Sequence, residues 1–171
     1  NFGPNNLGLP AAEIQARVDE AVAFFDLAAL MENHPYRLAF PLRKLVAMAS
    51  IYAMGPEVFV LDEPTTGQDH AGYQLVRRLV QRLREQKKTV VIVSHDMALL
   101  AETADRLVAM WAAEVIAVGT PREIFSNDDV MQRTKLHPPQ ITQFSRRRWP
   151  GDSQRLSLTV AEAVAHLTGE H

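Results

Sequence analysis

The sequence predicts an α/β fold built around a parallel β-sheet. Two short runs, residues 58–61 (VFVL) and 89–93 (TVVIV), are continuously apolar and rich in β-branched side chains, which is typical of strands buried on both faces. Between them, apolar residues recur at helical spacing over residues 75–83. A strand, a helix and a second strand at this spacing form a right-handed crossover, so we expect the two strands to be parallel.

Two helices are expected before the first strand. Pro10 suits the first position of a helix, which we expect to end near residues 30–33, because the His-Pro pair that follows disfavours helical backbone. Pro41 can open a second helix, and the Gly-Pro pair at residues 55–56 stops it.

Smaller elements are expected after the second strand. A short helix over residues 97–104 precedes two strand-like runs, residues 106–110 and 114–118, whose close spacing predicts a hairpin or a meander. Short helices and loops follow. The last helix is expected over residues 159–167, with a threonine at its N-cap and a glutamate three residues later.

The composition excludes several classes of protein. The chain has 171 residues, of which 47% are hydrophobic and 22% charged, so it is globular and not disordered. A formal net charge of -2 argues against a surface built as a whole to hold nucleic acid. The absence of cysteine removes disulfide scaffolds and thiolate zinc sites and is compatible with the cytoplasm. No apolar run reaches the 18 residues that a membrane span needs.

Polar residues whose side chains can take part in catalysis or ligand binding follow both predicted strands. Asp62 and Glu63 come directly after the first strand, and His95 comes two residues after the second. Because ligands of open parallel sheets bind at the carboxyl ends of the strands, Asp62 could hold Mg²⁺, Glu63 could activate a water and His95 could contact a terminal phosphate. Taken singly, Asp62 is more often a turn residue than a ligand, and His95 is more often an ordinary surface or core histidine than a catalytic one. Together, at matched strand ends, they point to a phosphate-processing site.

The strings VFVLDEPTTGQD and VIVSHD closely resemble the ATP-binding cassette (ABC) ATPases. This resemblance implies a P-loop NTPase-like fold with ATP and Mg²⁺ as cofactors. It implies that Asp62 coordinates Mg²⁺ through water and that Glu63 polarises the hydrolytic water. It also implies that Asp69 reaches across a head-to-tail dimer and that His95 contacts the γ-phosphate.

Three further segments, FGPNNLGLP, HPYRL and LHPPQIT, resemble the energy-coupling factor (ECF) subgroup, importers of vitamins, their precursors and cobalt or nickel ions. The resemblance implies a peripheral ATPase subunit on the cytoplasmic face of the membrane. Its implied partners are a second ABC ATPase subunit, a transmembrane coupling subunit and a substrate-binding membrane subunit, with no nucleic acid.

The sequence departs from the family pattern in its phosphate-binding loop. None of the eight glycines is followed by lysine, so the G-x-x-x-x-G-K-[ST] loop that cradles phosphates is absent. We therefore expect a parallel-sheet core lacking its N-terminal part, that is, a piece of a longer cassette. We expect the isolated chain to bind ATP weakly and to be inactive as an ATPase without the rest.

A second departure concerns the signature segment, which is L-S-G-G-Q in the family. Here the segment consists of Leu38, Ala39, Phe40, Pro41 and Leu42. Ala39 has no hydroxyl, Pro41 has no N–H, and Phe40 adds bulk where glycine lets a phosphate approach. We hypothesise an asymmetric dimer of non-identical cassettes, in which the ATP site completed by this segment hydrolyses poorly.

The expected domain organisation is a partial cassette over residues 1–125 and a small helical extension over residues 126–171. Within the cassette we expect a helical subdomain over about 1–55 and a core from the first strand to the histidine over about 56–120.

Two alternatives belong to other functional classes. The chain could be a non-catalytic ABC-fold module that binds or regulates a partner, which the missing phosphate loop favours and the intact DEPT and SHD strings oppose. It could also be a soluble ABC ATPase of DNA repair or translation, which only the basic run at residues 146–148 favours.

Overall fold

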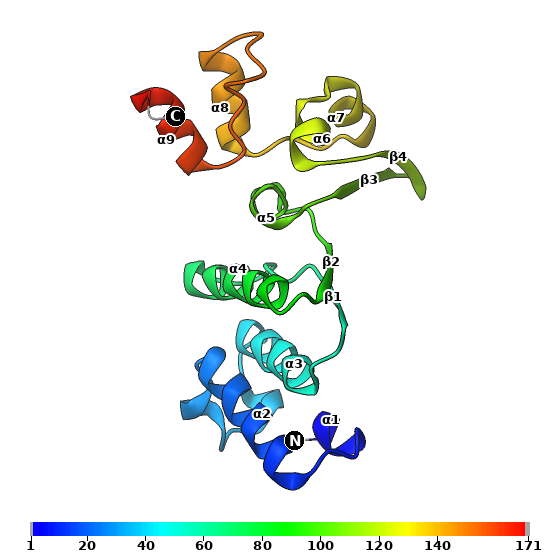
Figure 1. Ribbon diagram of the computed structural model, residues 1–171, viewed down its shortest axis with the longest axis vertical. Helices are drawn as coiled ribbons and strands as arrows, with labels where there is room; N and C mark the ends of the chain where they lie inside the picture. Colours follow the sequence, from blue (N-terminus) through cyan, green and yellow to red (C-terminus); the bar gives the residue numbers. More distant parts are fainter. Residues whose placement is uncertain (1, 170–171) are drawn as a thin grey trace. The chain divides into compact units, whose positions relative to one another are not determined.

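The computed structural model describes residues 2–169 of the chain. The chain forms two compact units, Asn1–Val93 and Ser94–His171. Figure 1 shows the order of the elements along the chain. The division into a cassette and an extension at residue 125 stays a prediction.

The first unit begins with helical segments. They are α1 (Phe2–Asn6), α2 (Ala11–Phe24), the 3-10 turns Ala28–Leu30 and Pro35–Arg37, and α3 (Phe40–Met54). Helix α2 ends earlier than predicted, because Phe25 turns into the core and Asp26 adopts a left-handed φ of 53° that breaks the helix. Helix α3 ends as predicted, at Gly55, whose φ of 65° forms a left-handed C-cap.

The predicted crossover is present in the first unit. Strand β1 (Val58–Asp62), helix α4 (His70–Glu85) and strand β2 (Thr89–Val93) follow one another, and the two strands pair in parallel. The register places Val58 opposite Thr89 and Asp62 opposite Val93. Asp62 therefore lies at the carboxyl edge of the sheet, where the sequence predicts it.

Only one face of this two-stranded sheet is buried. Phe59 and Leu61 of β1 belong to the core with Leu79 and Leu83 of α4, and α3 and α4 lie on the same side of the strands (Figure 1). On the opposite face Val60 is 67% exposed. The prediction of strands buried on both faces is therefore wrong for the residues that the structure describes, since helices cover a single face of the sheet.

The second unit holds the remaining elements. They are α5 (Met97–Thr103), β3 (Leu107–Trp111), β4 (Glu114–Gly119), α6 (Pro121–Ser126), α7 (Asp128–Thr134), α8 (Gln140–Arg148) and α9 (Val160–Thr168). Strands β3 and β4 pair antiparallel, so the predicted hairpin is confirmed. Ala112 and Ala113 form its turn with φ of 49° and 65°, the backbone that two-residue hairpin turns require.

Helix α6 starts with a capping box that was not predicted from the sequence. The Thr120 hydroxyl accepts a hydrogen bond from the Glu123 backbone N–H, and the Glu123 carboxylate accepts one from the Thr120 backbone N–H at 2.7 Å. The Thr120 hydroxyl also donates to the Glu123 carboxylate at 3.0 Å. The bonds from the Thr120 backbone N–H and, secondly, from its hydroxyl stabilise the charged carboxylate and hold the pKa of Glu123 below its ordinary value.

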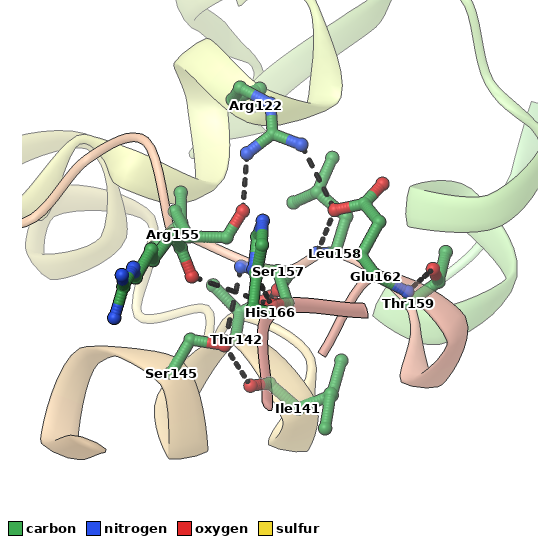
Figure 2. A network of polar contacts seen from close by, with 11 residues as sticks. Arg122, Ile141, Thr142, Ser145, Arg155, Ser157, Leu158, Thr159, Glu162 and His166 are labelled. Carbon is green, nitrogen blue, oxygen red and sulfur yellow. Dashed lines mark hydrogen bonds and ion pairs between the residues drawn. The ribbon is translucent and has the colours of Figure 1, made fainter. Parts of the chain in front are cut away.

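A polar network fastens the segment before α9 to α8 and α6 (Figure 2). The Thr142 hydroxyl donates to the Ser157 carbonyl at 2.8 Å, and the Ser157 N–H donates to the Ser145 hydroxyl at 3.2 Å. Arg122 donates to the Leu156 carbonyl and pairs with Glu162 at 2.9 Å. The network ties together side chains and backbone that are far apart in the sequence.

The predicted N-cap of α9 is part of this network. Thr159 accepts a hydrogen bond from the Glu162 N–H at 3.2 Å, as the sequence predicts. The Glu162 carboxylate, however, accepts from the Leu158 N–H at 2.9 Å. In a capping box this carboxylate would accept from the N–H of the N-cap residue, Thr159. Here it accepts from the residue before the N-cap and so joins the cap to the network.

We predict that Thr142→Val lowers the free energy of unfolding by about 1–3 kcal/mol, because the hydroxyl is fully buried and its loss leaves the Ser157 carbonyl without this donor. The matched change Thr168→Val, at an exposed site, should cost less than about 0.5 kcal/mol. Chemical denaturation measures both. Equal losses in the two variants would contradict the importance of the buried bond.

Candidate functional site

The candidate site is built on the loop that leaves β1 at its carboxyl end. Asp62 is the last residue of the strand, and its side chain is exposed at the sheet edge. The loop over residues 63–68 then turns back to the start of α4, held by backbone bonds from the Thr66 N–H to the Glu63 carbonyl at 3.2 Å and from the Gln68 N–H to the Thr65 carbonyl at 3.0 Å.

Glu63 occupies an unusual backbone conformation. Its N–H donates to the Val93 carbonyl at 2.8 Å, which extends the parallel pairing by one residue beyond the strand. Its φ is 45°, in the left-handed region, which costs a non-glycine residue about 1–2 kcal/mol. Such strain persists only where surrounding contacts impose it, and it concentrates at functional sites.

The carboxylate of Glu63 is also held locally. The Thr66 hydroxyl donates to Glu63 Oε2 at 3.1 Å. This contact fixes one carboxylate oxygen against the turn. The side chain is half-buried, which suits a group that orients a water at the edge of a sheet.

The signature-like segment lies beside this loop. Leu38 ends the 3-10 turn before α3, Ala39 occupies the N-cap of α3 without a side-chain hydrogen bond, and Pro41 lies in the first turn of the helix. The Pro41 carbonyl accepts a hydrogen bond from Gln68 Nε2 at 3.2 Å. A proline in the first turn is compatible with a helix start, so the helix predicted to open there is confirmed.

The Phe40 ring covers the glycine of the loop. A Cβ atom built on Gly67 would lie 3.2 Å from two carbons of that ring, and Gly67 has a φ of 77°. Both the close approach and the left-handed backbone therefore call for glycine at this position. Phe40 thus packs on its own chain's loop, and Leu42 packs against the core.

Asp69 has a defined role in its own chain. It is the N-cap of α4, and its Oδ1 accepts a hydrogen bond from the Gly72 N–H at 2.8 Å. The side chain is exposed. The carboxylate that is predicted to reach across a dimer therefore already accepts one hydrogen bond within its own chain.

His95 lies in the second unit, whereas the other candidate residues lie in the first. It is exposed, and it precedes α5, whose N-cap Asp96 accepts a hydrogen bond from the Leu99 N–H at 3.0 Å. The Ser94 hydroxyl accepts one from the Asp96 N–H at 3.0 Å. Serine and aspartate thus fix the local turn in which the histidine lies.

The donor set suits Mg²⁺ bound by few protein ligands. In the part of the chain that the structure describes, no three histidine, aspartate or glutamate side chains gather as a metal cage would require. Mg²⁺ in nucleotide sites is held by one or two carboxylates together with waters and phosphate oxygens. The exposed Asp62 carboxylate at the sheet edge fits that mode.

Two side chains make contacts at this site that were not predicted from the sequence. The Lys44 ammonium donates to the carbonyls of Glu63 and Thr66, and Gln68 donates to Pro41. No sequence pattern indicates that a lysine one turn into α3 contacts the loop over residues 63–68, or that a glutamine of that loop contacts α3.

The chain has close relatives among transport ATPases. It is 37% identical to the "Energy-coupling factor transporter ATP-binding protein EcfA" of Methanothermobacter thermautotrophicus over 98% of this chain and 55% of the relative. It is 34% identical to EcfA2 of Caldanaerobacter subterraneus over 97% of this chain and 59% of the relative. Over most of its length the chain is therefore similar to ABC transporter ATP-binding proteins. No protein-family model matches it.

Solved ABC structures share the fold. CbiO1 of Clostridium perfringens, described as part of the ABC transporter complex CbiONQ, matches with a TM-score of 0.64 at 30% identity over 90% of this chain and 57% of that one. A second solved ABC transporter, in an inward-facing conformation, matches with a TM-score of 0.65 at 22% identity over 75% of this chain and 51% of that one. The predicted ABC ATPase fold and the likeness to the ECF subgroup are confirmed.

The chain spans about half the length of the curated ABC relatives it matches, from 43% to 59% for the first four. Among the described residues, no helix combines the length and the apolar character that a membrane crossing demands.

We predict that Asp69→Ala lowers the free energy of unfolding by about 1 kcal/mol, because α4 loses its N-cap acceptor. The matched change Asp69→Asn should keep most of the stability, since an asparagine oxygen caps nearly as well. Urea denaturation measures both. If asparagine and alanine cost the same, the cap hydrogen bond is not what Asp69 contributes.

Proposed function

We propose that the full-length protein is the cytoplasmic ATPase subunit of an ECF-like ABC importer for vitamins or transition-metal ions. It would bind and hydrolyse ATP with Mg²⁺ to drive its membrane partners. The observation that carries this proposal is the Asp62–Glu63 pair at the carboxyl edge of a parallel strand pair, in a chain 37% identical to an ECF transporter ATP-binding protein.

Each candidate residue has a distinct proposed role. Asp62 would hold Mg²⁺ through water, and the ion would supply positive charge to the phosphates of ATP. Glu63, half-buried and fixed by its bond to Val93, would orient the attacking water and accept its proton. His95 would contact the γ-phosphate, and Asp69 would transmit the state of the site to the second cassette.

The residues that bind the ATP phosphates in the full-length protein would lie outside this sequence. No glycine of the chain is followed by lysine, so the chain itself offers no phosphate-cradling loop of the usual kind. The isolated 171 residues should therefore bind ATP weakly and hydrolyse little of it.

The proposed assembly contains a second, non-identical ABC ATPase subunit, a transmembrane coupling subunit and a substrate-binding membrane subunit. The protein would lie peripherally on the cytoplasmic face of the membrane, without nucleic acid. Non-identity is supported by the signature-like segment, where Ala39 and Pro41 lack the hydroxyl and the N–H that would contact a phosphate. The site that uses this segment would hydrolyse ATP poorly.

A non-catalytic partner-binding module is the second candidate function. The observation that favours it is the contact of Phe40 with Gly67, which directs the signature-like segment toward its own chain. A module of this kind would keep the fold and the exposed Asp62 without turning over ATP.

We predict that Glu63→Gln in the full-length, assembled transporter lowers ATP hydrolysis by about a hundredfold or more while ATP binding is preserved, because the water loses its base. Glu85→Gln, at the exposed end of α4, is the matched control and should retain wild-type turnover. Steady-state phosphate release and nucleotide binding measure the two effects. Retained turnover in Glu63→Gln would remove Glu63 from the proposed role.

We also predict that the combined changes Ala39→Ser, Phe40→Gly, Pro41→Gly and Leu42→Gln raise the turnover of the assembled transporter by up to about twofold. The restored hydroxyl and N–H groups would give the poor site the phosphate contacts that stabilise charge in the transition state. Phosphate release per dimer is the measurement. Unchanged turnover would count against the asymmetric dimer.

A further inference from the structure

Lys44 links helix α3 to the loop that carries Glu63. It lies in the second turn of α3, and its Nζ donates to the Thr66 carbonyl at 3.1 Å and to the Glu63 carbonyl. One ammonium thus joins two carbonyls of a loop that lies about twenty residues further along the chain. The same Nζ lies 5.6 Å from the centroid of the Phe40 ring, within the range of a cation–π contact.

Gln68 makes a second link between the same two segments. Its side-chain amide donates to the Pro41 carbonyl at 3.2 Å. The amide lies close over Gly72, where a Cβ atom would come within 2.2 Å of Gln68 Oε1, so this arrangement requires glycine at that position. The loop over residues 63–68 is therefore tied to the first turns of α3 at both of its ends.

These links act on the residue whose backbone is strained. Glu63 keeps a left-handed φ of 45°, and its carbonyl is bonded both by the Thr66 N–H within the turn and by Lys44 from outside it. Its carboxylate is bonded by the Thr66 hydroxyl, and Lys44 also holds the Thr66 carbonyl. Without the ammonium, the bonds between Glu63 and Thr66 remain, but both of their carbonyls lose the link that ties the turn to α3.

We propose that Lys44, assisted by Gln68, is a positioning residue for hydrolysis that clamps the Glu63 loop onto α3. The inference rests on the proposed role of Glu63. Lys44 acts through the backbone carbonyls of the loop and does not touch ATP or the attacking water. Its loss displaces the carboxylate and slows the chemical step, whereas nucleotide binding is unaffected.

The test compares variants of the full-length protein in the assembled transporter. Lys44→Met keeps the length of the side chain and removes the donor, so kcat should fall about tenfold or more, while KM for ATP and the thermal unfolding temperature stay near wild type. Lys44→Arg can still donate to both carbonyls and should recover most of kcat. Arg43→Met, an exposed neighbour on α3, is the matched control and should keep wild-type kcat.

Gln68→Met is the second variant, which serves if Lys44→Met fails to fold, and it should lower kcat in the same direction without changing KM. Wild-type kcat in Lys44→Met, or in Gln68→Met where the lysine variant does not fold, would overturn the clamp. A fall in kcat that arginine does not recover would also overturn it. Glu63→Gln, measured alongside, separates the two proposals. If Glu63→Gln abolishes turnover while Lys44→Met keeps wild-type kcat, only the proposed role of Lys44 fails. If Glu63→Gln retains turnover, the proposed role of Glu63 fails.

Discussion

The parallel pairing of β1 with β2 is the constraint on which the candidate site depends. The register from Val58–Thr89 to Asp62–Val93 brings the first strand to its end at Asp62. The bond from the Glu63 N–H to the Val93 carbonyl then continues the pairing by one residue and holds Glu63 at the sheet edge. Since the hydrogen bonds of a parallel ladder are set by register, a slip of one residue would exchange the buried and exposed faces and move both carboxylates.

The second determinant is the junction of α3 with the loop after β1. The signature-like segment opens α3, and three of its neighbouring contacts reach that loop: Phe40 on Gly67, Gln68 on Pro41 and Lys44 on Glu63. A segment with glycines at these positions would leave the loop less covered. At Phe40, the departure from the family pattern therefore coincides with a side-chain contact inside the chain that a glycine could not make, which is compatible with the proposed asymmetry between two ATP sites.

Local sequence signals predicted much of the fold. The crossover, the hairpin, the Gly55 cap and the Thr159 cap follow from apolar periodicity and from residue types with fixed backbone preferences. The exposure of Val60 did not follow, because an apolar strand residue carries no information on which elements cover it. For the site, the placement of Asp62 was predictable from its position after a strand. The left-handed φ of Glu63 and its contact with Lys44 were not, since both arise from tertiary contacts that leave no periodic pattern.

The central proposal is that this chain would supply the Mg²⁺ ligand and the base of a working ATPase. The most direct test is phosphate release from ATP by the full-length protein in its assembled transporter, with and without Mg²⁺. The account predicts turnover that requires Mg²⁺. ATP binding without Mg²⁺-dependent phosphate release would contradict it and would favour the non-catalytic module.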